Sequence, residues 1–128
     1  MPRHAPLGDR WSPAGAAPIS LVEPARESAP ESLSAGYFHL AGLPTPLFRA
    51  EIRTSGGSYF PDALWPEHNL VGECDGAVKY RDPEAYVREK DREQALRDLG
   101  LRMVRWGARE IMTRPWVVVA RVERELQD

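Results

Sequence analysis

The fold is decided by the stretch Leu-Val-Gly-Glu-Cys-Asp-Gly at residues 70–76, together with Asp-Ala-Leu-Trp-Pro-Glu at residues 62–67 just before it. Apolar and small residues at 69–75 predict a strand that Gly76 ends. Residues 59–65 predict a preceding strand, which Pro66 stops. The connection of three residues between the two strands is short, so it favours an antiparallel pair.

Three carboxylates stand at one end of this predicted pair. Side chains alternate along a strand, so Glu73 and Asp75 lie on the same side as Val71. The short connection brings Asp62 beside Glu73. The pattern therefore predicts that Asp62, Glu73 and Asp75 converge.

Converging carboxylates indicate a divalent cation. Two bare carboxylates ~4 Å apart repel by about 4 kcal/mol at an effective dielectric near 20. Oxygen-only ligands suit Mg²⁺ or Mn²⁺, which can polarise a phosphodiester and activate water. Lys79 could stabilise the charge that develops on the phosphate. The alternative is that the acids form the solvent face of a half-buried sheet and that Asp75-Gly76 is a turn pair.

With the elements outward from this centre, the predicted order of helices and strands is α-β-β-β-α-β-α-α. Glu31 stands at the capping-box position of the first predicted helix. Asp82 is the predicted N-cap of the long helix, which Gly100 ends. The predicted helices are 28–41, 82–99, 108–112 and 116–126, and the further predicted strands are 47–53 and 101–106. The last strand returns across a helix, which predicts a parallel neighbour.

Composition limits the class of protein. A chain of 128 residues predicts one domain. Residues 1–27 are broken by prolines and predict a disordered tail, which leaves 28–128 as the folded domain. One cysteine excludes an internal disulfide and suits a reducing compartment. No signal peptide and no membrane span is read, so a cytoplasmic location is expected. The net charge of -2 excludes a uniformly basic protein but permits a local basic face.

Other polar and aromatic residues have competing interpretations. Cys74 is expected to face the core as a small hydrophobic residue rather than to act as a nucleophile. His68 is expected to be an exposed turn residue, with action on a leaving group as the alternative. Two further groups have both a structural and a nucleic-acid interpretation. Core packing or base stacking is possible for the aromatic residues Trp65, Tyr80 and Trp106. Surface charge or phosphate contact is possible for the basic residues Arg88, Lys90, Arg92 and Arg105.

The motifs at 62–67, 70–80, 88–93 and 99–106 resemble a family of uncharacterised, very-short-patch-repair-endonuclease-like domains. That family belongs to the PD-(D/E)XK nuclease superfamily, and the resemblance runs from about Glu31 to the C-terminus. It implies an α/β fold of the restriction endonuclease-like type. Such a fold has an αβββαβ core with a mixed sheet flanked by helices.

The resemblance also implies roles for individual residues. Asp62 and Glu73 fall on the metal-binding acids, and Glu31 falls where many members place an accessory acid. Asp75 stands where the superfamily consensus has lysine, so Lys79 is the candidate that replaces it. DNA is the implied substrate and Mg²⁺ or Mn²⁺ the implied cofactor.

Three hypotheses remain open at this point. The first is a metal-dependent endonuclease that uses Asp62, Glu73, Asp75, Lys79 and Glu31. The second is a catalytically inactive nuclease-fold module that binds DNA or a partner protein, which the missing lysine favours. The third is a truncated product of a longer gene. Substrate specificity, oligomeric state and pathway have no signal in the sequence.

Overall fold

The structure is a computed structural model that describes residues 8, 10–13, 29–75 and 82–127. Its helices and strands form a mixed α/β arrangement. In chain order they are β1 (Trp11–Ser12), α1 (Ala29–Leu40), β2 (Glu51–Thr54), β3 (Gly57–Tyr59), β4 (Ala63–Trp65), a 3-10 helix (Pro66–His68), β5 (Leu70–Asp75), α2 (Pro83–Asp98), β6 (Arg102–Gly107), α3 (Ala108–Thr113) and α4 (Pro115–Gln127).

Most predicted elements are confirmed within a residue or two. The four helices and the strands at 69–75 and 101–106 appear where the pattern places them. Asp82 is the N-cap of α2, and its carboxylate accepts a hydrogen bond from the Glu84 N–H at 3.0 Å. Helix periodicity and capping depend only on residues close together in the sequence, so they predict these elements correctly.

Two strand predictions are wrong in detail. The predicted strand 59–65 is split into β3 and β4, because Pro61 has no N–H to donate to a sheet. The predicted strand 47–53 starts only at Glu51. Leu47 forms a single bridge to Leu64, and Arg49 then takes a positive φ of 57°, which breaks the extended backbone.

The short strand β1 lies inside the segment that the sequence analysis assigned to the tail. Trp11 pairs with Ile52 and Ser12 with Glu51, which adds an antiparallel strand at the edge of β2. Two residues give no readable periodicity, so the pattern contained no signal for β1. The remaining tail prediction falls on residues that lie outside the described part, except for Gly8, Arg10 and Pro13.

Two small sheets are present, with strand orders β1-β2-β3 and β4-β5-β6. β4 runs antiparallel to β5 with Ala63 opposite Gly72, and β5 runs parallel to β6 with Glu73 opposite Arg105. The predicted hairpin-like connection and the predicted parallel neighbour are therefore both confirmed. A parallel neighbour requires a crossover connection, and α2 lies within it.

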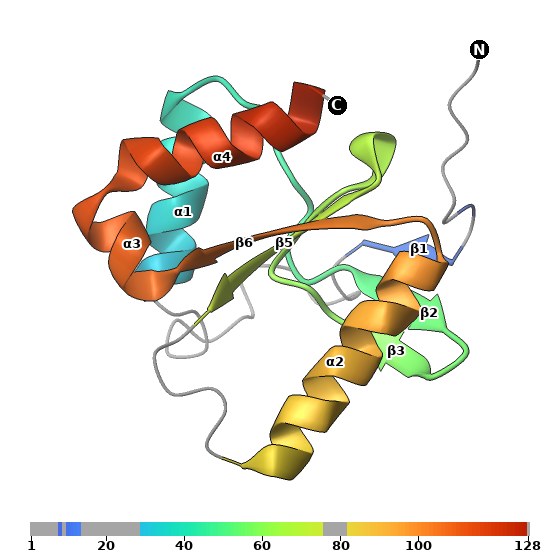
Figure 1. The fold of residues 1–128 in the computed structure, drawn as a ribbon. Coiled ribbons are helices and arrows are strands. Elements are labelled where there is room, and N and C mark those ends of the chain that lie inside the picture. Colours follow the sequence, from blue (N-terminus) through green and yellow to red (C-terminus); the bar gives the residue numbers. More distant parts are fainter. Residues whose placement is uncertain (1–7, 9, 14–28, 76–81, 128) are drawn as a thin grey trace.

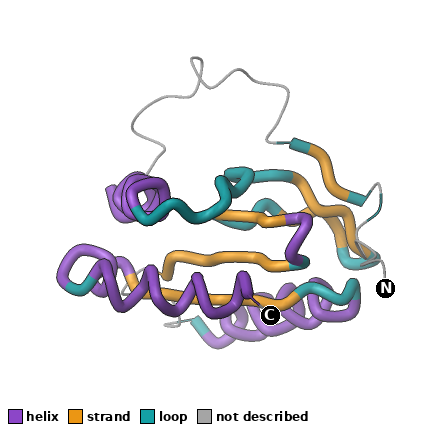
Figure 2. The backbone as a smooth tube through the Cα atoms, turned by 90° about the horizontal axis from the view of Figure 1, so that it is seen from above, coloured by secondary structure: helices purple, strands orange, loops and turns teal. Residues whose placement is uncertain are grey.

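Helices cover both faces of the β4-β5-β6 sheet. Figure 1 shows α1, α3 and α4 together on one face and α2 on the other. Seen from above, α4 with the C-terminus lies in front of the strands (Figure 2). Within the described residues, no helix is long and apolar enough to cross a membrane.

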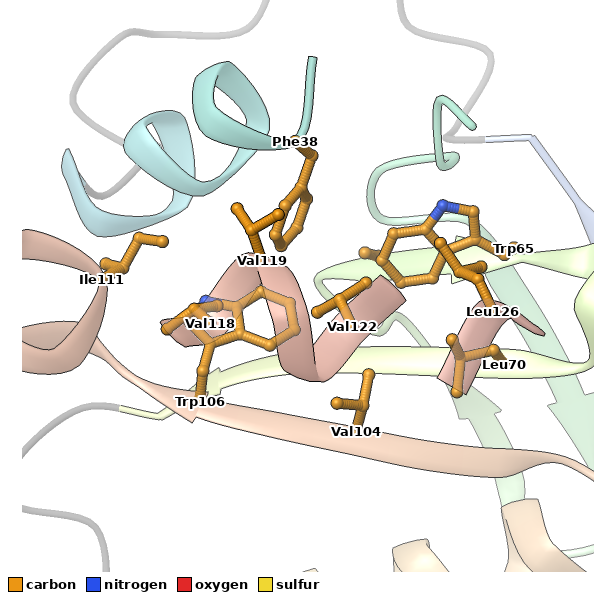
Figure 3. Close-up of a cluster of buried hydrophobic side chains, with 11 residues drawn as sticks. Phe38, Trp65, Leu70, Val104, Trp106, Ile111, Val118, Val119, Val122 and Leu126 are labelled. Atoms are coloured by element: carbon orange, nitrogen blue, oxygen red, sulfur yellow. The ribbon is translucent and has the colours of Figure 1, made fainter. Parts of the chain in front are cut away.

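The main core lies between the sheet and the three helices α1, α3 and α4. Figure 3 shows Phe38, Trp106 and Val118 among side chains that point toward one another. Trp65 and Trp106 are 2% and 3% exposed, so their predicted role in the core is confirmed. The Trp106 indole N–H donates to the Ser34 hydroxyl at 2.9 Å, which satisfies a buried polar group.

Gly72 allows the two tryptophans to close over β5. A Cβ built at Gly72 would lie 3.0 Å from the Trp106 ring and 3.1 Å from the Trp65 ring. We expect Gly72→Ala to lower the free energy of unfolding by about 1–3 kcal/mol, because overpacking forces rings and backbone apart. Chemical denaturation measures the change.

The matched control for this substitution is Gly36→Ala in α1. Nothing lies within 4 Å of a Cβ at Gly36, and this glycine is exposed on the helix. Alanine should leave the stability unchanged or raise it by up to about 1 kcal/mol. Equal effects at both positions would contradict the packing assigned to Gly72.

An ion pair closes the junction between α3 and α4. Arg121 contacts both carboxylate oxygens of Glu110, and the Gly107 N–H donates to Glu110 at 3.2 Å. The hydrogen bond with Arg121 is the main reason that the pKa of Glu110 falls to about 2. This pair should stabilise the fold above about pH 4.5, and the stabilisation should disappear as the pH falls toward 2.

Glu110→Gln tests this pH dependence, with Glu123→Gln as the control, because Glu123 is an exposed glutamate of α4, the helix that carries Arg121. We expect the Glu110 variant to lose about 1–2 kcal/mol at pH 7, a figure reduced for solvent screening because 35% of the Arg121 side chain is exposed. Its deficit should shrink as the pH falls toward 2. A deficit that stays constant with pH would refute the assignment.

Candidate functional site

Two of the predicted acids, Glu73 and Asp75, lie on the face of β5 that α2 covers. Val71 on the same face packs against Leu96 of α2, as side-chain alternation predicts. The Glu73 carboxylate lies 2.8 Å from the Arg92 guanidinium, and Glu73 is only 4% exposed. A buried carboxylate requires such a partner, because an isolated buried charge is costly.

Asp75 also faces an arginine. Its carboxylate lies 3.2 Å from the Arg105 guanidinium on β6. Arg105 also contacts Glu89 at 3.4 Å and Glu93 at 3.2 Å on α2. These groups, with Glu89 3.4 Å from Arg92, form what we call the α2 ion-pair network, which consists of Glu73, Asp75, Glu89, Arg92, Glu93 and Arg105.

Asp62 lies where β4 and β5 separate. The Pro61 carbonyl accepts from the Arg49 N–H at 3.1 Å instead of pairing with β5. The Asp62 carboxylate fills the gap and accepts from the Cys74 N–H at 2.7 Å. Strand N–H groups lie in the plane of the sheet, so this carboxylate lies between the α1 face and the α2 face.

Glu31 on α1 lies beside Asp62. Burial raises the pKa of Glu31, and the neighbouring Asp62 carboxylate, with which it is hydrogen bonded, raises it further. Arg49 lies 3.3 Å from Glu31 and acts in the opposite direction. Two carboxylates therefore lie together, one from α1 and one from the start of β4.

Cys74 lies on the core side of β5, as predicted from the alternation. It packs against the main core, and burial followed by the charge of Asp62 raises the pKa of its thiol to about 11. The thiol therefore stays protonated at neutral pH, which does not suit a nucleophile. His68 lies in the 3-10 helix and is half-buried rather than exposed, because its Nδ1 is 3.0 Å from the Leu126 carbonyl of α4.

The structure divides the predicted site residues into two groups. Asp62 and Glu31 lie together, whereas Glu73 and Asp75 are each paired with an arginine on the α2 face. Lys79 and Tyr80 lie outside the described residues. Among residues 29–75 and 82–127 there is no group of three or more histidine, cysteine or acidic side chains arranged to hold a metal ion.

Sequence reasoning missed Arg49 altogether and left Arg92 and Arg105 without partners. The parallel register places Arg105 opposite Glu73, so a pairing of the predicted strands could have indicated an acid partner for Arg105. No pattern indicates Arg49, because its position depends on one positive φ angle.

The donor set is chemically suited to Mg²⁺ or Mn²⁺, because all predicted ligands are carboxylate oxygens. Burial first and repulsion from Asp62 second raise the pKa of Glu31, and a divalent cation would relieve the repulsion. Glu73 is already compensated by Arg92. The fit of these residues to a metal ion therefore rests on Asp62 and Glu31. Glu73 directly precedes Cys74, whose N–H donates to Asp62.

Comparison with known proteins adds no relative: no protein-family model, no curated protein and no solved structure matches this chain.

Proposed function

We propose that the chain is a restriction endonuclease-like domain that acts as a metal-dependent nuclease on DNA in the cytoplasm. The observation that carries the proposal is the Asp62 carboxylate, which the Cys74 N–H fixes in the gap between β4 and β5. There it has the Glu31 carboxyl group beside it and Glu73 on the neighbouring strand. The proposal thus starts from one pair of carboxylates, Glu31 and Asp62, while Glu73 and Asp75 are paired with arginines on the α2 face.

The roles of the residues are those that the sequence predicts. Asp62, Glu73 and Asp75 would hold Mg²⁺ or Mn²⁺, and Glu31 would assist by removing a proton from the site. The bound ion would polarise the phosphodiester and lower the pKa of an attacking water. Lys79 keeps its predicted role beside the phosphate. The Cys74 N–H holds Asp62 still, which limits the reorganisation that ligand binding requires.

A second candidate function is supported by the α2 ion-pair network. Arg92 and Arg105 already balance Glu73 and Asp75, as expected of an inactive nuclease-fold module that binds DNA or a partner protein without cutting. Such a module needs no ion. The two functions therefore differ in their response to a chelator.

The experiment incubates the purified chain with plasmid and with short labelled DNA, in Mg²⁺, in Mn²⁺ and in excess EDTA. A nuclease cuts in the presence of the ion and stops when EDTA is added. Anisotropy of the labelled DNA is read in the same samples. Binding that persists in EDTA without cleavage under any condition supports the inactive module and contradicts the nuclease.

A further inference from the structure

Arg49 has a backbone conformation that side-chain-bearing residues rarely adopt. Its φ is 57°, and its N–H donates to the Pro61 carbonyl, next to Asp62. A non-glycine residue at positive φ is strained and persists where the surrounding structure enforces it, often at functional sites. The Arg49 side chain lies 3.3 Å from the Glu31 carboxylate, which in turn is hydrogen bonded to Asp62.

The three arginines that pair with predicted site acids differ in how far solvent reaches them. The side chain of Arg92 is 19% exposed and that of Arg105 is 26% exposed, and both lie within the α2 ion-pair network. The side chain of Arg49 is 51% exposed and contacts Glu31 at 3.3 Å. A large polyanion that approaches Asp62 therefore meets the guanidinium of Arg49 more readily than those of Arg92 and Arg105.

We propose that Arg49 binds a backbone phosphate of the nucleic acid and positions the strand over Asp62. A guanidinium is suited to this role because its planar fork matches two phosphate oxygens, and it remains charged at every working pH. An acid-rich site repels DNA, so a cation beside it is needed to bring a phosphate close. The inference rests on the proposed function, because it names the contact that delivers substrate to the same site.

The best test variant is Arg49→Gly. Glycine adopts φ near 57° without strain, so it keeps the backbone bond to Pro61 while it removes the guanidinium. Arg49→Lys retains the charge but loses the fork. The matched control is Arg53→Ala, because Arg53 is 48% exposed and pairs with Glu51 at 3.6 Å in the β2–β3 hairpin.

The measurement is the affinity for a short labelled DNA over a range of salt concentrations, read by anisotropy with Ca²⁺ in place of Mg²⁺. We expect Arg49→Gly to weaken binding about tenfold at low salt and to lower the slope of log affinity against log salt by about 1, the value of one phosphate contact. Arg49→Lys should keep the slope. Arg53→Ala should match the wild type, and all melting temperatures should agree within a few degrees.

Two results would overturn the inference, and they can be told apart. If the wild type binds DNA and Arg49→Gly has the same affinity and slope, Arg49 has only a structural role, and the proposed nuclease function stands. If the folded wild type binds no DNA even at low salt, the proposed function fails, and the inference about Arg49 fails with it.

Discussion

Arg92→Met should lower the free energy of unfolding by about 3 kcal/mol, the largest stability effect expected in this domain. Glu73 is almost fully buried, and the guanidinium of Arg92 lies 2.8 Å from its carboxylate. Methionine fills similar space but leaves the carboxylate without this charge. A double-mutant cycle with Glu73→Gln should give a coupling of about 2–3 kcal/mol, because removal of both charges relieves the penalty.

Arg97→Met is the matched control on the same helix. Arg97 pairs with Glu93 four residues earlier, and 48% of its side chain is exposed. Exposed pairs of this spacing contribute about 0.3–0.5 kcal/mol, so the control should change the stability little. Equal losses for Arg92→Met and Arg97→Met in chemical denaturation would show that the Glu73–Arg92 pair is not a buried ion pair in solution.

Asp62→Asn should reduce metal-dependent DNA cleavage by about a thousandfold, which equals about 4 kcal/mol of transition-state stabilisation. Asparagine keeps an oxygen that accepts from the Cys74 N–H, so the gap between β4 and β5 stays filled. It removes the charge that would hold the ion. The initial rate of cleavage at saturating Mg²⁺ is the quantity to compare.

Asp91→Asn controls for the loss of one negative charge, because Asp91 is an exposed residue of α2. This variant should cut at the wild-type rate. A wild-type rate for Asp62→Asn, in a protein whose melting temperature is unchanged, would exclude Asp62 as a metal ligand.

The order of elements was predictable because its signals are local. Periodicity of apolar residues and the cap at Asp82 place the helices. Alternation along β5 correctly places Val71, Glu73 and Asp75 on the α2 face, opposite to Leu70 and Cys74. The parallel register of β5 and β6 follows from the crossover through α2.

The site was less predictable, because it depends on tertiary partners. The sequence places Asp62 near β5, and the structure agrees. The arginines that balance Glu73 and Asp75 come from α2 and β6, and nothing in local spacing pairs them. The division of the acids between two faces also depends on the separation of β4 from β5 at Pro61. That separation is a property of the folded backbone.

The most direct test of the metal site is isothermal titration of Mn²⁺ into the wild type, Asp62→Asn, Glu73→Gln and the control Asp91→Asn. The proposed function predicts that the wild type and Asp91→Asn bind Mn²⁺ and that binding weakens by at least about tenfold in the other two, a loss of about 1.4 kcal/mol or more. Absence of binding to the folded wild type at millimolar Mn²⁺, or equal binding in all four proteins, would contradict a site built on Asp62 and Glu73.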